Sequence, residues 1–264
     1  MDDLDSREAF LRATFADPDN DLPRLVFADW LDEHDESAWA ELIRIQCEFR
    51  FPAERPRPEW KELFAREREL TAVIPMFHQV GQEGVPYPER GFADASVLHC
   101  TADQLGDAAE FRRHALQLHP EWYGCVRMKV AGGRIVGGKP IQTILTSPVT
   151  ERVTDLDLSG AVVTLREPEG DSAGDDGTYQ LLSEYEYRPT VTVQAVQALV
   201  DAREARRLVR LDLRNNDLDN DAARAVVHSP NLIRLKSLQL SDGNQLRGRT
   251  WQQLLERFGP DVLQ

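Results

Sequence analysis

The chain has 264 residues, of which 41% are hydrophobic and 29% charged, proportions that are typical of one large or two ordinary globular domains and exclude a disordered chain. The formal net charge is −14, and residues 1–50 alone carry 14 acidic and 5 basic side chains. A field of this sign repels phosphate groups, so neither nucleic acid nor an anionic membrane surface is expected as a partner.

The three cysteines, Cys47, Cys100 and Cys125, are widely spaced and odd in number, which is typical of reduced thiols rather than of a disulfide framework. The N-terminal residues are acidic where a signal peptide is basic. The apolar stretches are also shorter than the about 18 residues that a membrane span needs. These features predict a cytoplasmic protein.

Helical periodicity extends from Asp5 to about Val80 and predicts four helices, at about 5–16, from Pro23, at about 37–50 and from about Pro58. In the second helix we expect the apolar residues to face inward and the carboxylates to face water. Trp30 is therefore predicted to lie in the core, and its replacement by alanine is expected to cost about 3–5 kcal/mol. The inward-facing set of the second helix is Leu22, Leu25, Val26 and Trp30, with Phe27 and Leu31 as further candidates for the same side.

Four short sequences in this region carry a resemblance to a known family. Phe10-Leu11, Asp17-Pro18 and the run Pro23–Glu33 (PRLVFADWLDE) together resemble the bacterial repeat-companion domain, and the later Glu41–Glu48 resembles that family's second signature. The resemblance implies a short helical module, here residues 1–80, that precedes repeats and contributes no catalytic residue.

A leucine-rich template, L-x-x-L-x-L-x-x-N-x-L, is met in full by Leu208, Leu211, Leu213, Asn216 and Leu218. It recurs from residue 235 with one extra residue before the asparagine, and more loosely from residues 153 and 125. The steps of 27 and 28 residues resemble long leucine-rich repeats with a helix on the convex side. For residues 81–264 this implies an α/β fold, a short solenoid of parallel strands and convex-side helices.

The repeat spacing also places the remaining elements. A strand is expected at 92–98. The step from residue 156 to residue 211 is 55 residues, about twice the length of the other steps. We favour a β-hairpin insertion near 161–190, with polar turn formers at 167–178 as its tip; a degenerate repeat is the alternative. The helices expected between and after the strands are 101–118, 140–146, 192–205, 219–228 and 250–258.

One enzyme-like sequence occurs, because Gly133–Lys139 has the spacing GxxxxGK between a strand and a helix. A phosphate-binding loop needs Ser or Thr next, to hold magnesium, and Pro140 stands there instead. The histidines near Cys100 lack the paired spacing of a zinc site. We therefore expect no enzyme, catalytic residue, cofactor or metal. A nucleotide-binding or hydrolytic module using Gly132–Lys139 is the alternative.

The outward positions of the strands form the candidate site. Parallel strands lie about 4.8 Å apart, so these side chains should form lateral rows. One row brings Asp157 beside Asp212; folding offers no evident reason for this repulsion, whereas a partner's cation between them would relieve it. We expect a non-enzymatic interaction or scaffold protein that binds an unidentified protein; a charge-paired, merely solvated sheet is the alternative. The expected contact residues are Arg127, Lys129, Asp155, Asp157, Arg210, Asp212, Arg214 and Gln239.

Overall fold

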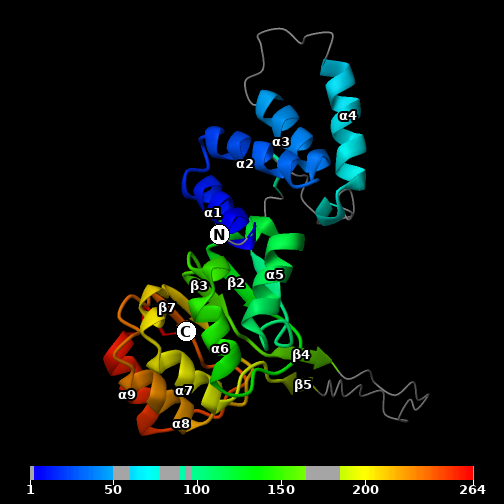
Figure 1. The fold of residues 1–264 in the computed structure, drawn as a ribbon. Helices are drawn as coiled ribbons and strands as arrows, with labels where there is room; N and C mark the ends of the chain where they lie inside the picture. Colours follow the sequence, from blue (N-terminus) through cyan, green and yellow to red (C-terminus); the bar gives the residue numbers. More distant parts are fainter. Residues whose placement is uncertain (1–2, 50–59, 78–89, 93–96, 165–184, 264) are drawn as a thin grey trace, which may run out of the picture. The chain divides into compact units, whose positions relative to one another are not determined.

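The computed structural model describes residues 3–49, 60–77, 90–92, 97–164 and 185–263 (Figure 1). Internal contacts divide the chain into two units that interleave along the sequence. The helical unit consists of Met1–Leu98, Ala108–Val126 and Ser147–Arg152, and the sheet unit of His99–Asp107, Arg127–Thr146 and Val153–Gln264. Two expected features lie outside the described residues: the hairpin tip at 167–178 and most of the strand at 92–98.

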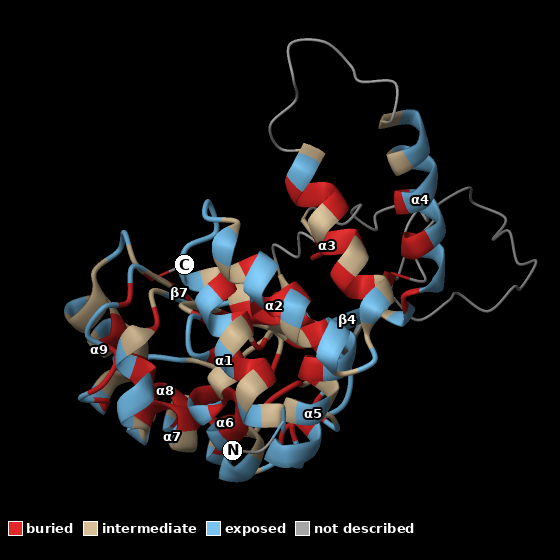
Figure 2. Ribbon diagram, turned by 45° about the horizontal axis from the view of Figure 1, so that its top comes forward, coloured by how far each residue is buried: buried red, intermediate tan, exposed pale blue. Residues whose placement is uncertain are grey.

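The helical unit begins with the helices that the periodicity predicts. They are α1 (Asp3–Ala16), α2 (Leu22–Glu33), α3 (Ser37–Phe49) and α4 (Trp60–Val73). Each packs against the next in the chain, and α5 (Ala108–Leu118) packs against α1. In Figure 2 buried residues predominate on α3, whereas exposed residues predominate on α4. The central position of α3 follows from its sequence, because Trp39, Leu42, Ile43 and Ile45 are all buried.

The prediction for the inward face of α2 was wrong for Leu22, Leu25 and Val26, whereas the further candidates Phe27 and Leu31 are buried. The buried residues of this helix are Arg24, Phe27, Ala28 and Leu31. Phe27 meets the edge of Trp39, with ring centroids 5.1 Å apart, and lies 6.3 Å from the ring of Phe92. These aromatic partners, distant in sequence, turn the helix so that Leu22, Leu25 and Val26 are exposed. Trp30 is half-buried at the rim of this core and stacks on His34 at 3.9 Å.

Charged side chains hold α1 against α5 inside the helical unit. The carboxylate of Glu8 is almost fully buried and accepts a hydrogen bond from Arg112 Nε at 2.6 Å. Arg112 also binds Asp5 at 2.5 Å, and Arg12 pairs with Glu8 within α1. A buried carboxylate is tolerated only when it is paired and hydrogen-bonded, so this network is part of the packing of the unit.

A five-stranded sheet forms the centre of the second unit, with the strand order β1-β2-β3-β6-β7. The pairs β2–β3, β3–β6 and β6–β7 are parallel. Each strand is only three or four residues long. Their bounds are β1 Leu98–Cys100, β2 Arg127–Val130, β3 Asp155–Asp157, β6 Arg210–Asp212 and β7 Ser237–Gln239.

Helices follow four of these strands and cover one side of the sheet. They are α6 (Gly138–Thr146), α7 (Val193–Asp201), α8 (Asn220–His228) and α9 (Arg249–Phe258), and each packs on the next in chain order. Side chains at two of the starts cap the helix: Thr192 Oγ1 accepts from Ala195 N, and Asp219 accepts from the amides of Asp221 and Ala222. Among the described helices, none is both long and apolar enough to span a bilayer.

Two expected elements differ from the observed ones. The structure places β1 at the end of the expected strand, and α5 begins at Ala108 rather than at Thr101. Thr101 and Gln104 instead close a reciprocal turn, in which each backbone amide donates to the other's side chain. Gly106 lies in the following turn, and its low helix propensity explains why the helix starts only after it.

An antiparallel pair interrupts the sheet between β3 and α7. Strand β4 (Ala161–Thr164) pairs with β5 (Tyr185–Arg188), with Ala161 opposite Arg188. The chain leaves the sheet at Gly160, whose amide donates to Arg214 O at 2.8 Å. A Cβ atom at Gly160 would lie 1.8 Å from Asn215 O, so only glycine fits this approach of two backbones.

Candidate functional site

The outward side chains of β2, β3, β6 and β7 form a surface that we call the sheet face. Their register confirms the two rows predicted from the sequence: Arg127, Asp155, Arg210 and Ser237 lie opposite one another, as do Lys129, Asp157, Asp212 and Gln239. The intervening Met128, Leu156, Leu211 and Leu238 are buried. The strands therefore bury one side and leave these two rows exposed or half-exposed.

The aspartates on this face pair with cations of the same chain. Asp155 lies between Arg127 Nε at 3.4 Å and Arg210 Nη1 at 3.7 Å. Lys129 Nζ lies 2.9 Å from the carboxylate of Asp157. Charges alternate along the first row, whereas the second row places Asp157 beside Asp212. The structure brings the row residues together as expected.

Arg214, just after β6, folds back over Asp212 and makes two side-chain contacts, Nε to Oδ1 at 3.1 Å and Nη2 to Oδ2 at 2.7 Å. It also lies 4.0 Å from Asp242. Burial by itself would raise the pKa of Asp157, but the hydroxyl and amide of Ser159 and the ammonium of Lys129 outweigh it and lower that pKa. The charged form of Asp157 is thus stabilised by groups of its own chain.

Asp157 and Asp212 also have a role in the fold, so the argument that folding offers no reason for them was wrong. Asp157 Oδ1 accepts hydrogen bonds from Ser159 N at 2.9 Å and Ser159 Oγ at 2.6 Å. Asp212 Oδ1 accepts from Arg214 N at 3.0 Å. Each aspartate therefore caps the amide two residues on, a local turn that ends its strand. No cation from a partner is needed between them.

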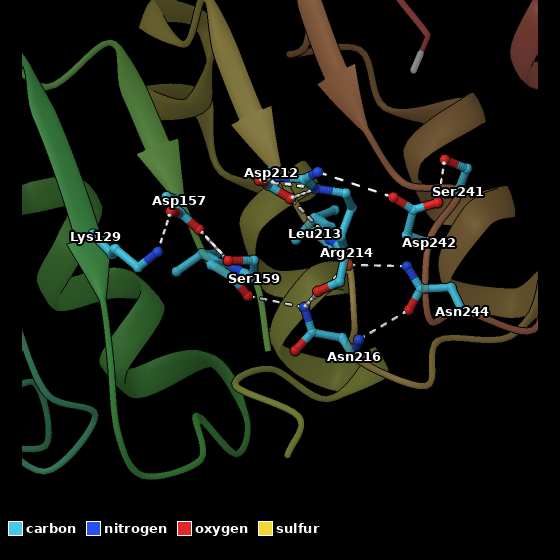
Figure 3. A network of polar contacts seen from close by, with 11 residues as sticks. Lys129, Asp157, Ser159, Asp212, Leu213, Arg214, Asn216, Ser241, Asp242 and Asn244 are labelled. Carbon is cyan, nitrogen blue, oxygen red and sulfur yellow. Dashed lines mark hydrogen bonds and ion pairs between the residues drawn. The ribbon is translucent and has the colours of Figure 1, made fainter. Parts of the chain in front are cut away.

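Two asparagines behind the strand ends connect this face to the rest of the sheet unit (Figure 3). The buried Asn216 donates to the carbonyls of Leu158, Leu213 and Arg214 at 2.9–3.0 Å. Its Oδ1 accepts from the amides of Thr190 and Val191 at 2.7 and 2.9 Å. This one side chain therefore joins the ends of β3 and β6 to the segment that follows the hairpin.

Asn244 repeats the arrangement one strand later. It donates to the carbonyls of Leu213 and Leu240, both at 2.9 Å, and accepts from the amides of Asn216 and Leu218. The leucine-rich template contains both asparagines, but it did not reveal that their amides bridge neighbouring strands. Each of these contacts gives a hydrogen-bond partner to a backbone group that burial would otherwise leave without one.

A groove of about 720 Å³ opens on the sheet face over β3, β6 and β7. The sequence analysis placed Ser237 in a row of this face but did not include Lys236, because Lys236 precedes the strand. The exposed position of Lys236 beside the charged row was the available signal. The lining residues are Asp155, Asp157, Val209, Arg210, Leu211, Asp212, Lys236, Ser237 and Gln239.

The loop Gly132–Lys139 adopts a conformation that its glycines permit, with φ of +74° at Gly133 and +77° at Gly137. Its centre is occupied by the fully buried Ile135. The amide of Ile135 donates to Thr190 O at 2.6 Å, and its carbonyl accepts from Thr192 N at 3.2 Å. The Ile135 amide is therefore already hydrogen-bonded within the sheet unit, whereas a phosphate-binding loop needs its amides to bind the ligand.

The histidines and cysteines show no catalytic arrangement in the parts of the chain that are described. Across these ranges, no group of three or more His, Cys, Asp or Glu side chains is placed to hold a metal ion. Burial raises the pKa of the Cys100 thiol to about 12, which makes it a poor nucleophile. His119 stacks on Trp122 at 4.2 Å and packs as an aromatic ring.

Compared with known proteins, the chain matches no protein family, no curated protein and no solved structure.

Proposed function

We propose that the chain is a non-enzymatic interaction or scaffold protein that binds another protein through the sheet face. The observation that carries this proposal is the parallel sheet with one open side. Parallel sheets usually have both sides covered by helices. Here the helices cover one side, while the outward side chains of β2, β3, β6 and β7 remain exposed or half-exposed, and those of β3, β6 and β7 line a groove of about 720 Å³.

The repeat architecture forms part of the same proposal. The sheet unit is a short leucine-rich-repeat solenoid in which the sheet face is the concave surface, and the N-terminal helices are a repeat-companion module. Support comes from the ladder of Asn216 and Asn244, which occupy the same template position and bond the same kinds of backbone groups in successive units. Solenoids of stacked repeats commonly present such a surface to partners.

The ion pairs of Asp155 with Arg127 and Arg210 can readily be replaced by ion pairs with a partner. The side chains of Arg127 and Arg210 are 54% and 59% exposed, and their contacts with Asp155 are long. Exposed ion pairs contribute only about 0–1 kcal/mol, so replacing Asp155 by a partner's carboxylate costs little. Lys236, which also lines the groove, adds a third cation. The partner segment is therefore expected to carry carboxylates opposite Arg127, Arg210 and Lys236.

Affinity capture from native cell extract tests the proposal with a pair of charge-reversed variants of the full chain. The groove variant combines Arg210→Glu with Lys236→Glu. The matched control combines Arg203→Glu with Arg249→Glu, two exposed arginines of the same unit that do not line the groove. Proteins retained by the parent and the control but lost from the groove variant support the proposal. Equal retention by all three chains, or no specifically retained protein, contradicts it.

A further inference from the structure

Helix α2 leaves a row of large apolar side chains in water. Leu22, Leu25 and Val26 are 65%, 36% and 43% exposed, and Trp30 is half-buried at the end of the row. We call these four residues the α2 stripe. Their spacing of three, four and eight residues places them along one side of the helix, over about 12 Å at 1.5 Å per residue.

The core of the helical unit does not account for the stripe. The inward side of α2 is already filled by Phe27, Ala28 and Leu31, which are fully buried. Isolated exposed apolar residues are common on protein surfaces, but adjacent ones along a helix mark a surface that another molecule covers. The half-buried Trp30 adds an aromatic side chain of the kind that anchors protein interfaces.

The charges beside the stripe indicate which molecule covers it. The last turn of α2 carries Asp29, Asp32 and Glu33, all exposed, at the end of the helix where the macrodipole is already negative. Arg44 from α3 pairs with Asp29 and Asp32, each at 2.7 Å, so one cation serves two carboxylates. The surface next to the stripe therefore keeps a negative field.

This negative field determines which kinds of molecule can bind at the stripe. A second copy of the chain would bring the same carboxylates against each other, and an anionic lipid surface would be repelled in the same way. A cationic segment gains from the field and can cover the apolar row at the same time. An amphipathic helix with basic residues beside its apolar side fits both features, because its anchors recur at the same three- and four-residue spacing.

We propose that the α2 stripe binds a cationic amphipathic helix of a partner protein. The apolar side chains of the partner cover Leu22, Leu25 and Val26, and its lysines or arginines face Asp29, Asp32 and Glu33. This surface lies in the helical unit and is independent of the sheet face, so either can fail without the other.

The test measures binding of two synthetic 18-residue helical peptides to the full chain by fluorescence anisotropy. One peptide has a leucine side and lysines elsewhere, and the other has glutamates in place of the lysines. The stripe variant combines Leu22→Ser with Val26→Ser. The matched control combines Val73→Ser with Ile233→Ser, two residues outside the stripe that are 66% and 68% exposed. A charge variant combines Asp29→Asn with Glu33→Gln.

We expect the leucine–lysine peptide to bind the parent and the control with the same Kd within twofold. Its Kd should rise at least tenfold for the stripe variant and at least threefold for the charge variant, and the leucine–glutamate peptide should bind at least tenfold more weakly. Failure of the leucine–lysine peptide to bind the parent, or equal binding to the stripe variant, overturns the proposal. So does self-association of the parent that the stripe variant abolishes, because a second copy is then the occupant.

Discussion

At the scale of single residues, the Asn216 side chain makes five hydrogen bonds within the sheet unit. Its amide joins three carbonyls and two backbone amides from segments that are far apart in the sequence. Asn244 makes comparable contacts but is half-buried, so water can replace part of what it loses. The two residues therefore form a natural comparison.

Asn216→Ala is expected to lower the free energy of unfolding by about 3 kcal/mol, because several buried backbone groups lose their partner at once. Asn244→Ala should cost about half as much. Urea denaturation of both variants measures the difference. Equal losses, or a loss below about 1 kcal/mol for Asn216→Ala, would show that the ladder contributes little to stability.

Phe27 and Trp30 lie three residues apart in α2 but differ in burial. Phe27 is fully buried against Trp39, whereas Trp30 is half-buried. Phe27→Ala should therefore cost about 3–5 kcal/mol, and Trp30→Ala no more than about 2 kcal/mol. Denaturation monitored by circular dichroism tests the order. A larger loss for Trp30→Ala would mean that the inward side of α2 is the one predicted from the sequence.

The Asp157 carboxylate is predicted to make stability depend on pH. Its pKa in the folded chain is lower than the ordinary value of 3.8, because hydrogen bonds from Ser159 and Lys129 outweigh the effect of burial. Its contribution is then fully present above pH 3.8 and is lost as the pH falls through the lowered pKa.

Asp157→Asn keeps an oxygen for the Ser159 amide and removes the charge. At pH 7 it should destabilise the chain by no more than about 1 kcal/mol, and the difference should vanish once the pH is below the lowered pKa, where the aspartic acid is also neutral. Urea midpoints of parent and variant at pH 7, 5 and 3 provide the measurement. A difference that stays constant over this range would show that charge plays no part.

At the scale of elements, the strands and helices of the sheet unit could be predicted from leucine spacing. Leu156, Leu211 and Leu238 are the central residues of β3, β6 and β7, as expected, because each is the buried position of a three-residue strand. The orientation of α2 could not be predicted. Leu25 and Val26 are as apolar as Phe27 and Ala28, and the choice between them is made by Trp39 and Phe92, which the local sequence does not contain.

A prediction at this scale concerns Gly160, at the junction between β3 and the β4–β5 pair. Gly160→Ala should destabilise the sheet unit by at least about 2 kcal/mol, because the new methyl group meets a backbone oxygen that cannot move alone. Ala161→Ser, one residue later at an exposed position, is the control and should change stability by less than about 0.5 kcal/mol. Similar stability of both variants would show that the backbones at this junction can separate freely.

At the scale of the whole molecule, the rows of the sheet face could be predicted. Side chains alternate between the two sides of a strand, and the repeat spacing determines which residues of adjacent strands are neighbours. The way in which the charges are satisfied could not be predicted. Arg214 bonds Asp212, and Ser159 bonds Asp157, in each case two residues earlier in the chain. These local contacts satisfy the two carboxylates, for which the sequence analysis expected a partner's cation. The groove over β3, β6 and β7, with Lys236, emerges only when the strands are assembled.

The central claim is that the sheet face binds a protein, and site-specific photo-crosslinking tests it most directly. A benzophenone amino acid is placed at Ser237 in the groove or at Gln194, an exposed position on α7, and each chain is irradiated in native extract. We predict a discrete crosslinked protein from position 237 that is missing from position 194 and is lost when Arg210→Glu and Lys236→Glu are added. Crosslinking from position 194 alone, or products unaffected by the two charge reversals, would contradict the account.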